Sequence, residues 1–211
     1  MTNMHIALIG PTGGTGRAVI QQALEKGYEI TALIRTSEKM EVSHDRLHLI
    51  QGDALLYEDV QKVIAGKDVV VCCLGTRAAD KRMVRAEGTR NIVRAMEAEG
   101  VRKLIAQTSL GYGDTAEMMP WYMTYLIIPI ILKNAFKDHP LQEEIIEQSN
   151  VDWVIARPGS LTNGPKTERY KQGFPTTEKV KLRISRADVA HFMLQQVESD
   201  RYLGQKVGLS Y

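Results

Sequence analysis

The chain has 211 residues, of which 44% are hydrophobic and 25% are charged. This balance suits one globular domain that can bury a sizeable core. The net charge is only +2, from 27 basic and 25 acidic residues. Nucleic-acid-binding domains usually concentrate basic residues on one face, so we expect no nucleic-acid partner.

The two cysteines, Cys72 and Cys73, are adjacent in an apolar run. Neighbouring residues of an extended strand point to opposite faces, so we expect two buried thiols and no disulfide between them. The sequence shows no signal peptide, and its apolar stretch at residues 121–132 is shorter than the ~20 residues that span a bilayer. We therefore expect a cytoplasmic protein without a membrane span. The histidines are scattered without ligand spacing, so no metal site is expected.

Apolar runs alternate with helical patterns along the chain. Strands are predicted at residues 6–9, 30–34, 47–50, 69–74, 103–107 and 153–156. Helices are predicted at residues 16–26, 57–65, 84–99, 141–148 and 185–197, the last with Ser185 as its N-cap. This alternation is typical of an α/β doubly wound parallel sheet, a three-layer Rossmann fold, here as a single domain over residues 1–211. Segments 111–140 and 162–181 interrupt the alternation and are expected to be substrate-side insertions.

A glycine-rich turn follows the first predicted strand. In a nucleotide-binding fold, Gly10 would permit the tight turn, Gly13 would let the backbone approach a pyrophosphate, and Gly16 would let the helix pack closely on the strand. The unpaired N–H groups and the dipole at the helix start favour an anion there. An ordinary glycine-rich turn is the alternative. The residues predicted to hold the pyrophosphate are Gly10, Thr12, Gly13, Gly14, Thr15 and Gly16.

Arg35 ends the second predicted strand, where NAD-binding sites commonly place an acid. A guanidinium there suits the 2′-phosphate of NADP, so NADPH is favoured over NADH. The alternative is a solvated arginine that pairs with Glu38 or Asp45. After the third strand, Asp53 and Ala54 are expected at the adenine, with helix capping as the alternative for Asp53.

The loop after the fourth strand, Leu74, Gly75, Thr76 and Arg77, is also expected at the cofactor. Gly75 would let the backbone pass close to it, and Arg77 would reach the pyrophosphate or cover the adenine.

Several motifs together resemble a known family. Gly10-x-x-Gly13-x-x-Gly16, Gly52-Asp53, Thr108-Ser109 and Arg157-Pro158-Gly159 resemble the atypical short-chain dehydrogenases/reductases of the NmrA-like, NAD(P)-binding branch. Within it, the chain is similar to the biliverdin reductase B or flavin reductase type over nearly its whole length. The motifs that carry this closer likeness are Gly75-Thr76-Arg77, Glu87-Gly88-x-Arg90-Asn91-Ile92-Val93-x-Ala95-Met96, Asp138-His139 and Asp188-x-x-His191-Phe192-Met193-Leu194.

The resemblance implies an NADPH-dependent oxidoreductase, a monomer or weak homodimer. Its substrate would be a small planar aromatic molecule, namely a flavin (FMN or riboflavin, as substrate and not as a prosthetic group) or a biliverdin-like linear tetrapyrrole. Ser109 and His139 would be the catalytic polar residues nearest the substrate. Ser160 and Leu161 would border the nicotinamide end of the cofactor.

The sequence departs from most short-chain dehydrogenases because it contains no Tyr-x-x-x-Lys. Reduction of a simple ketone with a tyrosine acid is therefore not expected, whereas a flavin can accept hydride at a ring nitrogen and take its proton from water. The same absence also suits a different class, an NmrA-like redox sensor that binds NADP(H) without catalysis. A sugar-nucleotide epimerase is less favoured, because the C-terminal region is short.

Two residues and one segment each allow two interpretations. Ser109 either faces the substrate or makes a local turn bond. His139 either donates a hydrogen bond or a proton, or caps a helix beginning near Pro140. Segment 121–132 is either a buried or partner-packed helix, or an apolar wall on which a planar substrate stacks against Trp121, Tyr122 or Tyr125.

Overall fold

The computed structural model describes residues 4–36, 42–76, 82–130 and 133–211. Six parallel strands, β1 (His5–Ile9), β2 (Glu29–Ile34), β3 (Leu47–Gln51), β4 (Val69–Cys72), β5 (Lys103–Gln107) and β6 (Asp152–Pro158), confirm the six that were predicted. The sheet order is β3-β2-β1-β4-β5-β6-β10-β8. Chain order therefore reverses between β1 and β4, which is where ligands bind in open α/β sheets.

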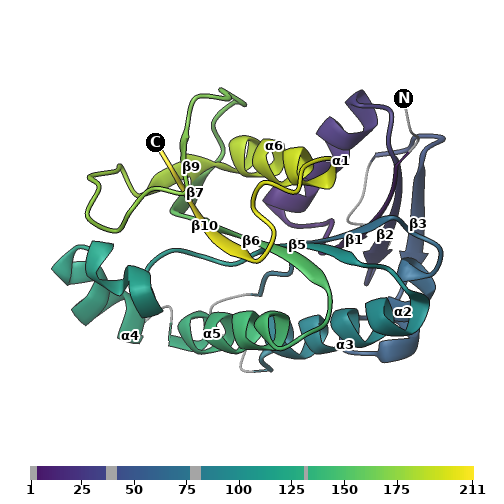
Figure 1. Ribbon diagram of the computed structural model, residues 1–211, viewed down its shortest axis with the longest axis horizontal. Coiled ribbons are helices and arrows are strands. Elements are labelled where there is room, and N and C mark those ends of the chain that lie inside the picture. Colours follow the sequence, from purple (N-terminus) through teal and green to yellow (C-terminus); the bar gives the residue numbers. More distant parts are fainter. Residues whose placement is uncertain (1–3, 37–41, 77–81, 131–132) are drawn as a thin grey trace.

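Helices cover both faces of the sheet, as Figure 1 shows. One face carries α1 (Gly14–Glu25) and α6 (Arg186–Val197), and the other carries α2 (Tyr57–Ile64), α3 (Val84–Glu99) and α5 (Lys133–Glu147). The three-layer, doubly wound α/β fold is thus confirmed. The Ser185 side chain caps α6 as predicted, because its Oγ accepts the N–H of Asp188 at 3.0 Å.

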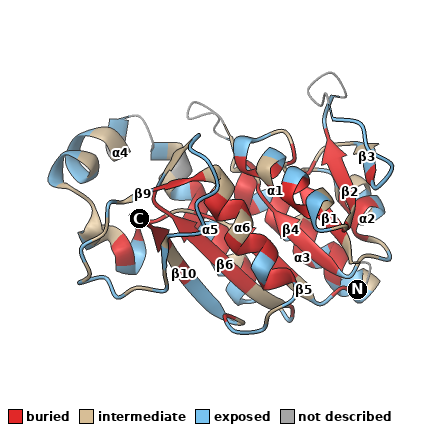
Figure 2. Ribbon diagram, turned by 90° about the horizontal axis from the view of Figure 1, so that it is seen from above, coloured by how far each residue is buried: buried red, intermediate tan, exposed pale blue. Residues whose placement is uncertain are grey.

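The two faces of the sheet belong to two separate cores. Ile6, Leu8 and Val71 pack with α1 and α6, whereas Ala7 and Ile9 pack on the opposite side with α2 and α3. This is why the central strands β1, β2 and β4 are buried along most of their length (Figure 2) and read as continuous apolar runs.

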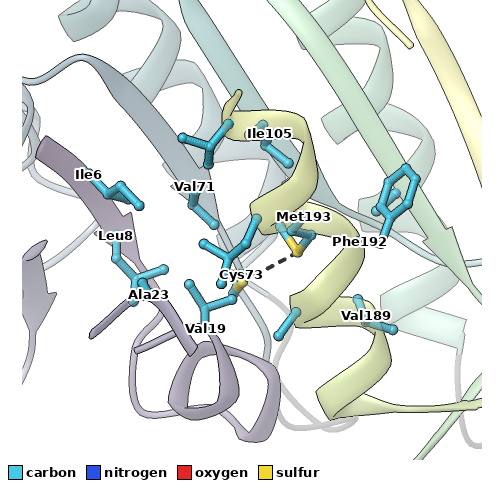
Figure 3. Packing of buried hydrophobic residues seen from close by; sticks show 14 of the residues in the cluster. Ile6, Leu8, Val19, Ala23, Val71, Cys73, Ile105, Val189, Phe192 and Met193 are labelled. Atoms are coloured by element: carbon cyan, nitrogen blue, oxygen red, sulfur yellow. Dashed lines mark hydrogen bonds between the residues drawn. The ribbon is translucent and has the colours of Figure 1, made fainter. Parts of the chain in front are cut away.

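The adjacent cysteines follow the same alternation. Cys73 lies in the first core, with its Sγ 4.0 Å from the Met193 sulfur (Figure 3), and Cys72 lies in the second core. Burial raises the pKa of both thiols, that of Cys72 to about 11. Both are buried free thiols, as expected.

Helix α5 differs from the prediction. It begins at Lys133, not at residue 141, and contains Pro140. Proline removes a backbone donor and disfavours a helix interior, which is why the sequence pattern suggested a start there. Tertiary bonds outweigh that preference, because the Asp138 carboxylate accepts the backbone N–H groups of Arg85 and Ala86 at 3.0 and 2.9 Å. The alternative in which His139 caps a helix starting at Pro140 is wrong.

Two strands of the main sheet and several short elements were not predicted from the sequence. Strand β10 (Gln205–Ser210) lies parallel to β6, and β8 (Lys171–Gln172) adds an antiparallel edge. A second small sheet joins β7 (Ser160–Thr162) to β9 (Arg183–Ser185). In β10 the apolar pattern is reduced to Val207 and Leu209, both buried between polar residues and Gly208.

The two expected insertions have different structures. Residues 113–130 form a 3₁₀ helix, η2 (Gly113–Met118), a π-helical turn, η3 (Met123–Ile127), and a short α4 (Ile128–Ile130), which project at one end of the molecule (Figure 1). The later insertion is tied to α6 by Asp188. Its carboxylate accepts both the N–H and the hydroxyl of Thr167, at 2.7 and 2.8 Å, and the hydroxyl of Tyr211 at 2.7 Å.

Candidate functional site

A cavity of about 1010 Å³ opens at the carboxyl edge of the sheet, where β1 and β4 are neighbours. Its volume is at the upper end of the range that ligand pockets usually show. Its walls come from the segments that follow β1, β2, β3 and β4 and from the start of α3. The lining residues are Ile9, Gly10, Pro11, Thr12, Gly13, Leu33, Arg35, Thr36, Gly52, Asp53, Ala54, Leu55, Cys73, Leu74, Gly75, Thr76, Arg82 and Val84.

The glycine turn requires glycine at two positions for steric reasons. Gly10 has a φ of +88°, and an added Cβ would lie 2.4 Å from the Cys73 carbonyl oxygen. A Cβ on Gly16 would lie 2.2 Å from the Gly10 oxygen. Gly13, by contrast, lines the cavity, and a Cβ added there would have no neighbour closer than the Gly10 oxygen at 3.7 Å. The turn thus packs against its own backbone on one side and leaves the other side open to a ligand.

Helix α1 begins inside this turn, at Gly14, two residues earlier than predicted. Its N-cap, Gly13, supplies no side-chain hydrogen bond, and the first turn contains no acidic residue. The first amides of the helix therefore have no intrahelical partner, and this end of the helix, whose N-cap lines the cavity, favours an anion. Gly14, Thr15 and Gly16 form the first turn of α1. They are not among the residues that line the cavity.

Arg186 packs directly against this turn, and the sequence analysis missed it. A Cβ on Gly14 would lie 2.4 Å from the Arg186 Cδ. The guanidinium donates to the Asn163 Oδ1 at 2.6 Å and to the Leu161 carbonyl at 3.4 Å. Among the described residues no carboxylate pairs with it. The signal in the sequence was a basic residue directly after the Ser185 cap.

Two predicted adenosine-side residues, Arg35 and Asp53, lie together on the cavity wall. Arg35 is exposed at the end of β2, and no carboxylate within the described ranges pairs with it; Glu38 lies outside the described residues. The Asp53 Oδ1 accepts the Leu55 N–H at 3.1 Å, so it stabilises the turn before α2. It is not the helix N-cap, because that position is Leu56.

The loop after β4 lies beside the glycine turn and also lines the cavity. Leu74, Gly75 and Thr76 line it, and a Cβ on Gly75 would meet nothing within 4 Å. Thr76 is held by Arg85, whose Nη1 donates to its Oγ1 at 2.9 Å. Arg77 lies outside the described residues. The sequence analysis missed Arg82 and Val84, which line the cavity on either side of Met83, a residue in left-handed conformation with φ 48°.

His139 does not lie where the sequence predicted a catalytic group. Its side chain is 7% exposed, does not line the cavity, and stacks on the Tyr112 ring at 5.8 Å between centroids. Burial, with a smaller contribution from the charge of Arg85, lowers the pKa of His139 to about 3. The ring is therefore neutral near pH 7 and has no imidazolium proton to donate.

Ser109, Ser160 and Leu161 lie near the same sheet edge but not on the cavity wall. The Ser109 hydroxyl donates to the carbonyl of Leu110 at 3.0 Å, which is the local bond that the sequence analysis gave as the alternative. Ser160 is exposed, and Leu161 is half-buried, in β7.

A buried ionic cluster fixes the segment that carries Ser109. Glu143 of α5 accepts hydrogen bonds from the Thr108 hydroxyl at 2.7 Å and the Tyr112 hydroxyl at 2.5 Å. Arg157 of β6 donates to both of its carboxylate oxygens, at 2.9 and 2.5 Å. Burial alone would raise the pKa of Glu143, but Arg157 and the hydroxyl donors lower it below its ordinary value. The cluster joins the carboxyl ends of β5 and β6 to α5.

Fold, glycine turn and cavity together define a Rossmann-type nucleotide-binding protein. The sequence profile of a family described as NAD(P)H-binding matches residues 10–200, and the chain belongs to that family. The structure also has neighbours of the atypical short-chain dehydrogenase/reductase type, as the sequence resemblance predicted. Membership of an NAD(P)H-binding family and a Rossmann-type fold are thus established.

Among solved structures, ChuY, an anaerobillin reductase of Escherichia coli, superimposes with a TM-score of 0.81 at 20% identity, covering 98% of this chain and 97% of that one. A short-chain dehydrogenase/reductase of Veillonella parvula, in complex with NADP, gives 0.81 at 16% identity over 99% and 94% of the two chains. At these identities the likeness concerns the fold.

The curated relatives include uncharacterized proteins and an assembly factor. An uncharacterized chloroplastic protein of Arabidopsis thaliana is 27% identical over 77% of this chain, and the photosystem II assembly factor Ycf39 of Synechocystis is 23% identical over 76%. The matches cover only 61% and 46% of those two proteins. YwnB of Bacillus subtilis, also uncharacterized, is 22% identical over 96% of both chains.

Within the described ranges, no group of three or more His, Cys, Asp or Glu residues is placed to hold a metal ion. No helix in the same ranges is long and apolar enough to cross a membrane.

The packing of the glycine turn makes a testable prediction. We expect Gly16→Ala to lower the free energy of unfolding by ~1–3 kcal/mol, because its Cβ would meet backbone atoms that cannot move aside. Gly75→Ala is the matched control, since its Cβ would meet open space. Urea unfolding without ligand should separate the two variants, and equal stabilities would contradict the packing described here.

The buried His139 predicts an acid-sensitive stability. Its pKa lies near 3 when folded and near the ordinary 6.5 when unfolded, so the unfolded chain binds more protons between these values. Stability should fall as pH drops below about 6.5, with ~1.4 kcal/mol lost by about pH 5.5 from this residue. Urea unfolding of the protein and of His139→Gln, each at about pH 8 and about pH 5.5, measures this loss of stability.

The control for this experiment is His191→Gln. The pKa of His191 is also lowered by burial, but by less, so this variant should keep most of the pH dependence. If His139→Gln loses as much stability on acidification as the unaltered protein, the assignment to His139 is wrong.

Proposed function

We propose that this protein is an NADPH-dependent reductase that transfers hydride to a planar conjugated acceptor, either a flavin such as FMN or riboflavin or a biliverdin-like linear tetrapyrrole. The observation that carries the proposal is the cavity at the switch point, with Gly13, the N-cap of α1, on one wall and Arg35 on another. We expect a cytoplasmic monomer or weak homodimer.

The residues present fit NADP(H). Gly13 and Gly75 border open space, which a pyrophosphate passing between the two loops would fill. The amides that begin α1 would receive the pyrophosphate, and Arg186 would supply a cation beside it. Arg35 would hold the 2′-phosphate through a planar fork. The NADP complex of the Veillonella protein supports this choice of cofactor.

The choice of acceptor follows from the absence of a Tyr-x-x-x-Lys motif and from the flat rings that the site would orient. NADPH supplies the hydride, and no Tyr-x-x-x-Lys is present to protonate a simple ketone. The chain's contribution would be to hold two flat rings in contact, with donor and acceptor atoms ~3–3.5 Å apart. Ser109 would be the hydroxyl nearest the acceptor. His139 would be a positioning residue, because its ring stacks on that of Tyr112. That ChuY is an anaerobillin reductase supports a tetrapyrrole among the candidates.

A second candidate is a protein that binds NADP(H) without catalysis. The buried, neutral His139 and the local bond of Ser109 favour it, because neither group is presented to the cavity. The occurrence of photosystem II assembly factors among the relatives also agrees with a role other than catalysis.

The first experiment separates the two candidates. Purified protein is mixed with NADPH and with FMN, riboflavin or biliverdin, and the loss of NADPH absorbance is followed. We expect turnover with at least one acceptor, reduced in Ser109→Ala at unchanged thermal stability. Tight NADP(H) binding without turnover on any planar acceptor would overturn the reductase and leave the sensor.

The second experiment assigns the two arginines. Arg35→Ala should weaken NADPH binding roughly 10- to 150-fold, which corresponds to ~1.5–3 kcal/mol for charged hydrogen bonds, and should leave NADH binding nearly unchanged. Arg186→Ala should weaken both cofactors alike, because the pyrophosphate is common to them. Calorimetric titration measures each constant. A loss of NADH binding equal to that of NADPH in Arg35→Ala would refute the 2′-phosphate assignment.

A further inference from the structure

Residues 119–130, the protruding segment, expose large apolar side chains to solvent. The exposed fractions are 70% for Trp121, 73% for Tyr125 and 76% for Ile130, and 48% for both Tyr122 and Leu126. No residue of the π-helical turn η3 is buried. Soluble monomers rarely expose a contiguous apolar surface of this kind unless it binds something.

The protruding segment is not part of the cofactor cavity, since no cavity-lining residue comes from it. It lies at one end of the long axis of the molecule, as both overall views show (Figures 1 and 2). The expectation that these aromatic residues form a wall for the substrate therefore has no support in the geometry of the cavity. These side chains are exposed to solvent outside the nucleotide cavity.

The charge that follows the segment along the chain is positive, whereas the exposed Glu117 that precedes it is acidic. Residues 118–137 contain two lysines, Lys133 and Lys137, both exposed, and no acidic residue. The loop that leads from β8 to β9 lies at the same end in both views (Figures 1 and 2).

This second region adds to the positive charge. Residues 166–183 contain six exposed basic residues and two acidic ones, Glu168 and Glu178. Each acid is already paired with a lysine, at 3.0 Å to Lys166 and 2.6 Å to Lys171. Arg169, Lys179, Lys181 and Arg183 make no ion pair with a described residue.

We propose that this end of the protein docks reversibly on an anionic lipid bilayer surface. Trp121, Tyr125 and Ile130 would enter the boundary between headgroups and acyl chains, which aromatic rings with a polar edge favour. The lysines and arginines of the two regions would lie at the anionic headgroups, each adding a modest electrostatic attraction. The segment is far too short to span, so the association is peripheral.

A second copy of the chain fits this end less well. An isologous dimer through the protruding segment would bring the same surface of two copies together. The basic side chains of residues 166–183 would then face their own equivalents across the interface, and like charges placed so are unfavourable. An anionic bilayer satisfies the apolar and the basic side chains at once.

The test uses the full chain and vesicles of phosphatidylcholine alone or with phosphatidylglycerol. We expect co-sedimentation with the anionic vesicles, weakened as salt rises from ~0.1 to ~0.5 M, and little with phosphatidylcholine. Tryptophan emission should shift to the blue on binding. The shift should vanish in Trp121→Phe, which leaves Trp153 in β6 as the remaining tryptophan.

Matched variants identify the surface. Trp121→Ser/Tyr125→Ser/Ile130→Ser should weaken vesicle binding by more than ~10-fold, because three apolar contacts are lost. Lys133→Glu/Lys137→Glu should weaken the preference for anionic lipid, because the basic residues of 166–183 remain. Leu49→Ser, at an exposed apolar residue of β3 at the other end of the molecule, should change nothing. Unchanged thermal stability shows that each variant is folded.

Three results would overturn the proposal. The first is no binding to anionic vesicles. The second is binding that the triple serine variant retains, which would assign it to the basic loop alone. The third is a dimer in light scattering that the triple variant dissociates while vesicles remain unbound, which would assign the surface to a second copy. None of these readouts depends on reductase activity, so the two proposals fail separately.

Discussion

The close approach of the β1–α1 turn to the end of β4 is the constraint on which the site depends. Gly10 lies against the Cys73 carbonyl, and Gly16 lies against the Gly10 carbonyl, at distances that admit no side chain. Because these contacts are between backbone atoms, they fix where α1 begins relative to the sheet. They also place Cys73 between the packing of α6 and the cavity wall. One contact thus sets both the core on that face and the direction of the helix start.

The sheet and the adenosine half of the site were predictable because their signals are local. Strands buried on both faces read as uninterrupted apolar runs, and parallel crossovers bring their carboxyl ends to one edge. Arg35, Asp53 and Gly75 were therefore found from their positions directly after strands. The elements that were missed have weak local patterns: β10 has only Val207 and Leu209 as apolar residues, and α5 contains a proline that tertiary bonds tolerate.

The contacts behind the glycine turn were harder to predict, because they join segments that are distant in the chain. Arg186 reaches the glycine turn from α6, about 170 positions along the chain, and no local pattern reveals such a contact. The reverse holds for His139, whose motif suggested catalysis. Its burial against Tyr112 and the nearby charge of Arg85 remove the proton that the expected role needed. A polar residue in a recognisable motif can therefore have a packing role, as His139 has against Tyr112.

Asp138, the neighbour of His139 in the same motif, holds the start of α3 in this fold. Its carboxylate receives the first amides of α3 and lies 3.4 Å from Arg85, whose Nη1 also holds Thr76 at 2.9 Å on the cavity wall. Asp138 belongs to the early turns of α5, the helix that follows the protruding segment. The pair therefore connects the start of α5 to the loop that faces the glycine turn. An ionic contact in that position determines the shape of the cavity without touching a ligand, so its replacement should disturb cofactor binding as much as stability.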